Sequence, residues 1–274
     1  MSLEYLKIIR PFNGIAAAAA VWIGSLIAGG LLTPSLALIL GMISVFLISG
    51  GGAVVNDFFD VEIDKLNRPN RQIASGKISR RIALVYSGIL FVIGCTAAYF
   101  INFDTLIVGV LASALLIAYA AQLKKTILVG NIVISGLIAL TFIFGGLILG
   151  NYTALLPLAL FIFLSNTGRE LYKAIDDAIG DHKYNVNSLA IKLGVVNARI
   201  IANIFLVVAV IFSFIPYFLK ILGPVYMFFA VLGDIIFLSA AVAPVKYGSR
   251  LRKIAMLIAI AAFFIGAYSM RIVI

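Results

Sequence analysis

The sequence predicts an all-α integral membrane protein built as a bundle of nine transmembrane helices. Three observations lead to this prediction: the composition, the spacing of the apolar runs and the distribution of the charged residues. Of the 274 residues, 63% are hydrophobic and only 12% are charged, whereas a soluble domain carries about 25% charged residues. We therefore expect the whole chain, 1–274, to form one helical membrane domain rather than two soluble ones.

Nine apolar runs approach or exceed the length of about 20 residues that a helix needs to cross the hydrocarbon core. Glycine and proline punctuate the short connections, as at Gly29-Gly30 and Gly223-Pro224. The sixth run is short, and we expect its helix to continue through polar residues to about residue 178. In order, the runs are 12–32, 35–58, 82–101, 105–123, 127–149, 153–168, 200–219, 222–243 and 254–272.

The lysines and arginines indicate how the bundle is oriented. With nine spans, all but two of the 21 cations fall on one face, the exceptions being Lys220 and Arg271. The positive-inside rule makes that face cytoplasmic, with the N-terminus on it and the C-terminus outside. Topology and anionic lipid thus explain the net charge of +10 without nucleic-acid binding. We expect a multi-pass protein of the cell membrane whose active site faces the cytoplasm.

A dense acidic cluster directly follows the second apolar run. On a helix, Asn56, Asp60 and Asp64 share one face, and Asp57 lies on its flank. Carboxylates that face one way repel one another unless a cation lies among them. Carboxylate and amide oxygens are ligands that Mg²⁺ takes, usually together with substrate phosphates. A solvated helix end is the alternative reading of this cluster taken by itself.

A second acidic cluster follows the sixth run and favours the metal-binding interpretation. Asp177 and Asp181 are i, i+4 neighbours on the same predicted membrane face as the first cluster. Two such clusters can hold Mg²⁺ against a diphosphate from opposite sides. The long loops at about 61–81 and 179–199 follow the two clusters, and we expect them to cap the site.

Basic side chains are interleaved with these acids. Arg68 and Arg71 can fork onto phosphate oxygens. Lys124, at the end of the fourth run, and Lys173, a turn before Asp177, can neutralise charge on a departing pyrophosphate. The alternative for each is an anchor at the cytoplasmic surface. We rank Arg68 and Lys124 first.

The two clusters resemble the signatures of the UbiA superfamily of intramembrane prenyltransferases. The first signature is Asn56-Asp57-x-x-Asp60-x-x-x-Asp64 followed by Asn67-Arg68-Pro69, and the second is Asp177-x-x-x-Asp181 followed by Asn187-Ser188-Leu189. Arg10-Pro11-x-Asn13 and the pair Tyr119 and Lys124 also resemble family positions. The resemblance covers nearly the whole chain. Two departures are Ala174, where relatives often have Asp, and a Tyr119–Lys124 spacing that is one residue longer than in some members with aromatic substrates.

This resemblance implies a nine-helix fold around a central cavity, with Mg²⁺ held between the aspartate motifs beneath cytoplasmic caps. It also implies an isoprenyl diphosphate donor. The metal ligands would be Asn56, Asp57, Asp60, Asp64, Asp177 and Asp181. Lys124, Arg68 and Tyr119 would be catalytic, and the substrate-binding residues would be Asn13, Arg68, Arg71, Tyr119, Lys124 and Lys173.

Within the family, the run from Tyr119 to Asn131 looks most like archaeal members whose acceptor is a prenylated glycerol phosphate. The expected reaction is then transfer of a geranylgeranyl group to the glycerol hydroxyl of geranylgeranylglyceryl phosphate, in ether-lipid biosynthesis. The extra cations near the site suit an acceptor that is itself a phosphate. An aromatic-acid prenyltransferase, acting on a hydroxybenzoate or naphthoate, is the alternative within the family.

A secondary transporter or channel is the alternative from another class. Asp234 lies midway along the eighth run, where an ionisable residue suggests a functional site. A transporter would have discontinuous helices and acids near the midplane, but only Asp104 and Asp234 of the 11 acids lie away from the cytoplasmic rim. We therefore favour reading Asp234 as a buried carboxyl that hydrogen-bonds a neighbouring helix.

Overall fold

The computed structural model describes residues 3–30, 32–126, 128–180, 189–243 and 245–272, and within them the regular structure is entirely helical. Short one-turn helices connect the long ones. In chain order the elements are α1 (Leu3–Ile8), α2 (Pro11–Ile27), α3 (Leu36–Phe59), α4 (Val61–Asn67), α5 (Arg80–Tyr99), α6 (Phe103–Ala121), η1 (Leu123–Lys125), α7 (Val129–Leu147), η2 (Thr153–Leu155), α8 (Leu156–Gly180), α9 (Leu189–Ser213), α10 (Ile215–Phe218), α11 (Pro224–Val242) and α12 (Val245–Ile272).

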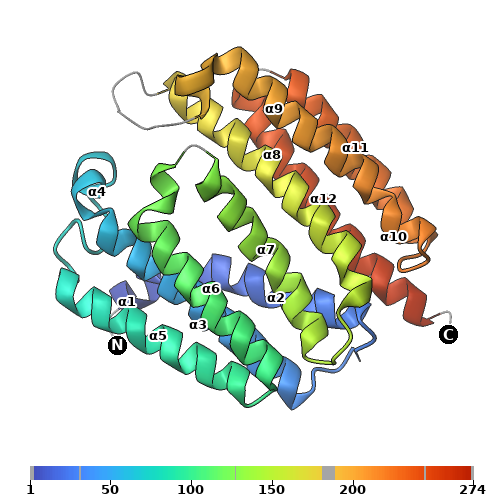
Figure 1. Ribbon diagram of the computed structural model, residues 1–274, viewed down its shortest axis with the longest axis horizontal. Helices are drawn as coiled ribbons and strands as arrows, with labels where there is room; N and C mark the ends of the chain where they lie inside the picture. Colours follow the sequence, from blue (N-terminus) through green and yellow to red (C-terminus); the bar gives the residue numbers. More distant parts are fainter. Residues whose placement is uncertain (1–2, 31, 127, 181–188, 244, 273–274) are drawn as a thin grey trace.

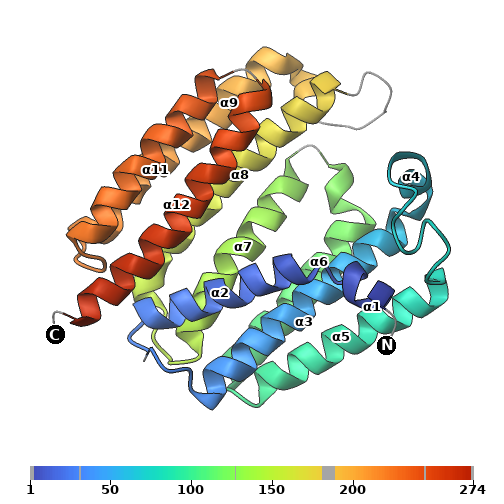
Figure 2. The same cartoon turned by 180° about the vertical axis from the view of Figure 1, so that it is seen from behind.

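The helices form two bundles that follow the order of the chain (Figure 1). The N-terminal bundle contains α1 to α7, with α3 packed against α2, α5 and α6. The C-terminal bundle pairs α8 with α9 and α11 with α12. Seen from behind, α2 crosses beside α3 and α7, and α12 runs along the C-terminal bundle (Figure 2). Contacts of α7 with α8 and of α2 with α12 join the two bundles.

Helix α3 is the centre of the N-terminal bundle because three consecutive glycines let its neighbours approach closely. A Cβ atom added at Gly51 would lie 3.0 Å from the ring of Phe91 on α5, and one at Gly52 would lie 2.9 Å from Leu116 on α6. The Ser87 hydroxyl of α5 donates a 3.0 Å hydrogen bond to the carbonyl of Gly51. This packing places the C-terminal ends of α3 and α6 near each other.

The protein is a multi-pass membrane protein. Among the described residues, seven helices are long and apolar enough to cross a membrane, namely α3, α5, α6, α7, α9 with its continuation, α11 and α12. The first predicted run is the shorter apolar helix α2, of 17 residues. The sixth is α8, which continues to Gly180 and so confirms the expected polar extension. Each predicted run thus matches a helix, while the count of nine spans stays a prediction.

The predicted loop at 61–81 is partly helical. It begins with α4, and α5 begins at Arg80 after a series of turns. The predicted loop at 179–199 is shorter than expected, because α9 already begins at Leu189. This helix is kinked at Gly194, whose φ is 80°. Residues 181–188 lie outside the described part of the chain. The capping role of these segments stays a prediction.

Candidate active site

Four segments that carry the predicted site residues lie at one end of the molecule. They are the end of α3 with α4, the connection η1 between α6 and α7, the start of α2 and the polar end of α8. Both views place α4, the end of α6 and the end of α8 toward the same end of the bundle (Figures 1 and 2). The backbone therefore places the two acidic segments at the same end of the molecule, as the sequence predicts.

Asn56, Asp60 and Lys124 form the centre of this region. The Lys124 Nζ lies 2.5 Å from Asp60 Oδ1 and 3.3 Å from Asn56 Oδ1. Asn56 in turn donates from Nδ2 to Asp60 Oδ2 at 2.9 Å. The Lys124 and Asp60 side chains are only 15% and 19% exposed, so this ion pair is shielded from solvent. Two oxygens separated by a helical turn thus converge on one positive charge.

The position of Lys124 depends on the compact connection between α6 and α7. The Thr126 hydroxyl accepts a 3.2 Å hydrogen bond from the Gly130 N–H, which leaves one fewer free donor at the start of α7. A Cβ atom at Gly130 would lie 2.7 Å from the carbonyl oxygen of Leu123, so the close approach of η1 to α7 requires glycine. Lys124 is therefore held toward α3 by the backbone around it.

Asp57 and Asp64 belong to a second group of charges, in which each carboxylate contacts an arginine. Arg71 Nη1 lies 3.0 Å from Asp57 Oδ1 and 2.7 Å from Asp64 Oδ2. Arg10 Nη2 lies 2.5 Å from the same Asp57 oxygen. The Asp57 side chain is only 3% exposed, and a carboxylate at that depth needs such partners. This group ties α3, α4 and the turn after α4 to the start of α2.

Arg10 is a site residue that our sequence analysis did not select, although its resemblance to a family position was a signal. It has a left-handed backbone, with φ 52° and ψ 65°, directly before the Pro11 that starts α2. Such a backbone is uncommon for residues other than glycine. It turns the chain between α1 and α2, where the Arg10 guanidinium meets Asp57.

Tyr119 connects the first acidic segment with α8. It is half-buried in the last turn of α6, within electrostatic range of both Glu170 and Asp60. Glu170 lies on α8 about two turns before Asp177 and pairs with Arg169 at 2.7 Å. Tyr119 therefore lies near both the end of α3 and the polar end of α8.

No contact with Asn56, Asp60 or Lys124 is described for the remaining predicted residues. Asn13 and Arg68 are exposed, at the first turn of α2 and at the end of α4. Lys173 is exposed and lies 3.9 Å from Glu170. Asp177 is in the last turn of α8, but its side chain is not among those described. Asp181 lies outside the described residues.

The donor atoms of the first segment fit a hard divalent cation. Asn56 and Asp60 present an amide oxygen and a carboxylate to one point, and the charge at that point is the Lys124 ammonium. Among the described residues, no three acidic, histidine or cysteine side chains are close enough together to hold a metal ion. Asn56 and Asp60 could therefore supply part of a ligand set, which would need other oxygens to complete it.

The sequence of the chain is similar to a characterised family and to curated archaeal proteins. Residues 17–267 match the UbiA prenyltransferase family. The digeranylgeranylglyceryl phosphate synthase of Methanosphaera stadtmanae is 37% identical over 271 residues, which cover 96% of this chain and 98% of that protein. The synthase of Methanococcoides burtonii is 39% identical over 278 residues, covering 96% and 99%.

Solved structures show the same fold. A digeranylgeranylglyceryl phosphate synthase structure superposes with a TM-score of 0.86 at 37% identity, covering 96% of this chain and 97% of that one. A UbiA homolog from Archaeoglobus fulgidus bound to GPP and Mg²⁺ superposes with a TM-score of 0.74, covering 97% and 99%. The latter is 19% identical, so its likeness establishes the fold alone.

Proposed function

This chain belongs to the UbiA prenyltransferase family, and we propose that it transfers a geranylgeranyl group from geranylgeranyl diphosphate to the glycerol hydroxyl of geranylgeranylglyceryl phosphate. Diphosphate is released, and the product is a membrane lipid precursor of the archaeal ether-lipid type. The enzyme is therefore a prenyltransferase. The chain is similar over nearly its full length to several archaeal digeranylgeranylglyceryl phosphate synthases, at 36–39% identity over 96% of the chain, and this supports the choice of acceptor.

One observation of the structure supports prenyl transfer more than any other. The Lys124 ammonium lies against Asp60 and Asn56 at the end of the molecule that the polar part of α8 also reaches. A diphosphate placed there meets a lysine and has carboxylate oxygens beside it. This is the combination of groups that phosphate binding through a divalent cation requires.

We propose that Asn56 and Asp60 supply the ligands of the N-terminal segment for Mg²⁺, and that Asp177 and Asp181 complete the set. When bound, Mg²⁺ stabilises the negative charge of the departing pyrophosphate. Asp57 and Asp64 contact Arg10 and Arg71, so their contribution as direct ligands stays a prediction. Through those contacts they hold α4 and the start of α2 in place around the site.

The cations of this chain bind phosphate and orient the donor. Lys124 Nζ lies 2.5 Å from Asp60 Oδ1, and its ammonium would bind a diphosphate oxygen if Asp60 held a divalent cation. Arg68 is exposed at the end of α4 and offers a planar fork for a second phosphate contact. Lys173 and Arg71 add positive charge at the same end. Developing charge on the leaving group is thus met by groups already in position.

The apolar helices beneath this end accommodate the isoprenoid chain. Tyr119 and Asn13 line the region between phosphates and acceptor in this proposal. Enclosure by apolar side chains keeps water away from an allylic carbon that has positive character, so that the acceptor hydroxyl captures it. Nine spans, with this end facing the cytoplasm, place the phosphates at the inner leaflet, where the positively charged loops lie.

A direct assay separates this function from the aromatic-acid alternative. Purified protein receives radiolabelled geranylgeranyl diphosphate with either geranylgeranylglyceryl phosphate or 4-hydroxybenzoate, each with and without Mg²⁺. We expect a labelled lipid product only with the glycerol phosphate and only with Mg²⁺. A labelled benzoate product would establish the alternative, and absence of product and of pyrophosphate release in every arm would reject both.

A further inference from the structure

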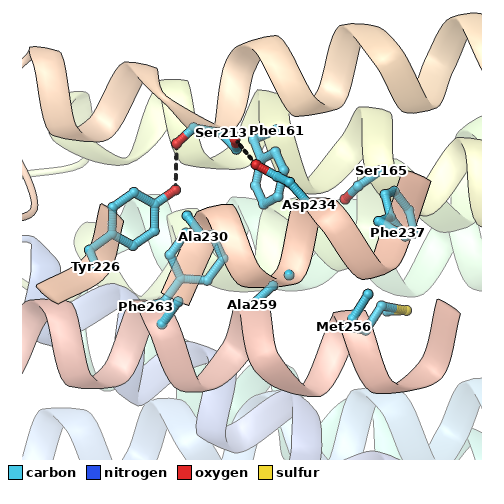
Figure 3. A pocket seen from close by; sticks show the side chains of 13 residues that line it. Phe161, Ser165, Ser213, Tyr226, Ala230, Asp234, Phe237, Met256, Ala259 and Phe263 are labelled. Atoms are coloured by element: carbon cyan, nitrogen blue, oxygen red, sulfur yellow. Dashed lines mark hydrogen bonds between the residues drawn. The ribbon is translucent and has the colours of Figure 1, made fainter. Parts of the chain in front are cut away.

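The C-terminal bundle contains a partly open cavity of about 40 Å³ that is far from the acidic motifs in the sequence. Polar side chains from α8, α9 and α11 line it, and Figure 3 shows them among the apolar residues of the lining. Ser165 comes from α8, Ser213 from the end of α9, and Tyr226 and Asp234 from α11. The rest of the lining is apolar, including aromatic side chains. Polar side chains from distant parts of the chain thus meet at one small volume in an otherwise apolar lining.

The protons around Ser213 can be counted from the geometry. Ser213 Oγ lies 2.7 Å from the carbonyl oxygen of Val210 and 2.6 Å from Asp234 Oδ2. A hydroxyl has one proton to donate, and both contacts are too short to be bridged without a proton each. The carbonyl of Val210 has none. If Ser213 donates to Val210, the proton in the second contact belongs to the carboxyl group of Asp234.

The surroundings favour the same assignment. Val210 and Ser213 are in the last turn of α9, where the helix dipole is negative and repels a carboxylate. Asp234 is near the middle of α11, where a charged carboxylate in lipid is costly. Tyr226 is the only other titratable side chain among the described residues of the lining, which includes no lysine or arginine. Its hydroxyl already donates to the carbonyl of Ser213 at 2.7 Å.

The cavity also has the size and the polar partners that a buried water needs. One water requires about 10–15 Å³ of such volume and two to four polar contacts. Ser165 donates its proton to the carbonyl of Ile162 at 3.1 Å, so that its oxygen lone pairs remain available to accept. The second oxygen of a protonated Asp234 is likewise an acceptor. Both residues line the cavity, so each offers an acceptor to a water bound in it.

We propose that this cavity binds an internal water and that the main hydrogen-bond partner of this water is a protonated Asp234. The carboxyl group donates to Ser213 and accepts from the water. The carboxyl group thereby joins the end of α9 to α11 without any charge. The site binds a small neutral hydrogen-bonding molecule, in contrast to the diphosphate end of the enzyme, and does not depend on the proposed reaction.

Infrared spectroscopy tests the proton. The carbonyl stretch of a protonated carboxylic acid is distinct from the bands of a carboxylate and shifts in D₂O. We expect the spectrum of the parent minus that of Asp234→Asn, at neutral pH, to contain this stretch. Asp234→Asn is expected to keep the parental Tm, because its amide N–H replaces the acid proton toward Ser213. A difference spectrum that contains carboxylate bands instead would overturn the proposal.

Hydroxyl-radical footprinting tests the water, because radicals formed from a bound water oxidise the side chains next to it. Tyr226 is buried, at 1% exposure, and lines the cavity. We expect it to be oxidised in the parent and protected in Asp234→Leu, whose apolar side chain fills the site. Tyr172, at 3% exposure and outside the cavity lining, serves as the reference within each sample. Tyr226 protection that is equal in the two proteins would reject the water site.

Discussion

Carboxylates at two places in this protein are stabilised in opposite ways. At the end of the molecule that carries α4, Asp57, Asp60 and Asp64 each contact a lysine or an arginine at 3.0 Å or less. In the C-terminal bundle, Asp234 instead contacts the hydroxyl of Ser213. All four acids are largely shielded from solvent, so burial is not what distinguishes them.

The difference follows from position along the membrane helix. The first three acids are at the end of α3 and in α4, where chain reversal brings loops with arginines and lysines within reach. Asp234 is near the middle of α11, away from both ends of that helix, and the described lining of its cavity includes no lysine or arginine. A buried carboxylate with a cation nearby can stay ionised, whereas one with only hydroxyl neighbours is less costly as the neutral acid.

Removing the negative charge of Asp60 should have the largest effect on activity of the substitutions considered. We expect Asp60→Asn to lower kcat/KM for geranylgeranyl transfer by about 10²–10³-fold, because a charge that stabilises the departing pyrophosphate through its cation is lost. The assay is labelled lipid product at fixed Mg²⁺. Asp104→Asn, in the turn at the opposite end, is the matched control and should behave like the parent. Equal activity of Asp60→Asn and the control would contradict the assignment.

Lys124 and Lys125 are adjacent cations that allow a sharper test. Lys124 Nζ lies 2.5 Å from Asp60, whereas Lys125 is exposed. A charged hydrogen bond contributes about 1.5–3 kcal/mol, so we expect Lys124→Met to lower kcat/KM by roughly 10–10²-fold and Lys125→Met to have little effect.

The same pair of variants also separates the two roles of Lys124. If Asp60 binds Mg²⁺ as proposed, the ion competes with the Lys124 ammonium when no diphosphate is present, so Lys124→Met should be stabilised at a lower Mg²⁺ concentration than the parent. The shift of Tm with Mg²⁺ measures this. Identical Mg²⁺ titrations of Lys124→Met and Lys125→Met would show that no such competition exists.

A substitution of Arg71 tests whether its contacts with Asp57 and Asp64 stabilise the folded protein. Arg71→Gln leaves Asp64 without a cation and Asp57 with only Arg10. Breaking a fully buried pair costs about 3–5 kcal/mol, and Arg71 is 18% exposed, so we expect a loss of about 1–3 kcal/mol. Thermal unfolding in detergent measures it as a lower Tm. Arg80→Gln, which removes a cation over the Phe58 ring, should cost less.

Glu4 is expected to give the smallest effect, because its partners Lys7 and Lys77 are exposed side chains. A hydrogen bond from Lys7 lowers the pKa of Glu4 below its ordinary value of 4.5. The folded-state pKa is thus below the unfolded one, so the small stabilisation is present above the unfolded pKa and is lost as pH falls through the folded pKa. Glu4→Gln should match the parental Tm in acid and fall slightly below it at neutral pH.

The sequence by itself determined the membrane class, the helices and the two acidic segments. Composition and apolar runs suffice for this because a helix in lipid must satisfy its backbone internally and needs a fixed apolar length. The continuation of α8 to Gly180 was likewise readable, since no proline or turn signal interrupts it. The spacing of Asn56 and Asp60 placed both on one helical face, and the structure confirms that they are in contact.

Only the tertiary structure decided which cation each carboxylate meets. Arg10 and Asp57 are 47 residues apart, and Lys124 and Asp60 are 64 apart, so local periodicity carries no information about either pair. The pairs form because Gly50 to Gly52 bring other helices onto α3 and because Arg10 takes a left-handed backbone. The partners of Asp234 were decided in the same way, by the packing of α9 on α11.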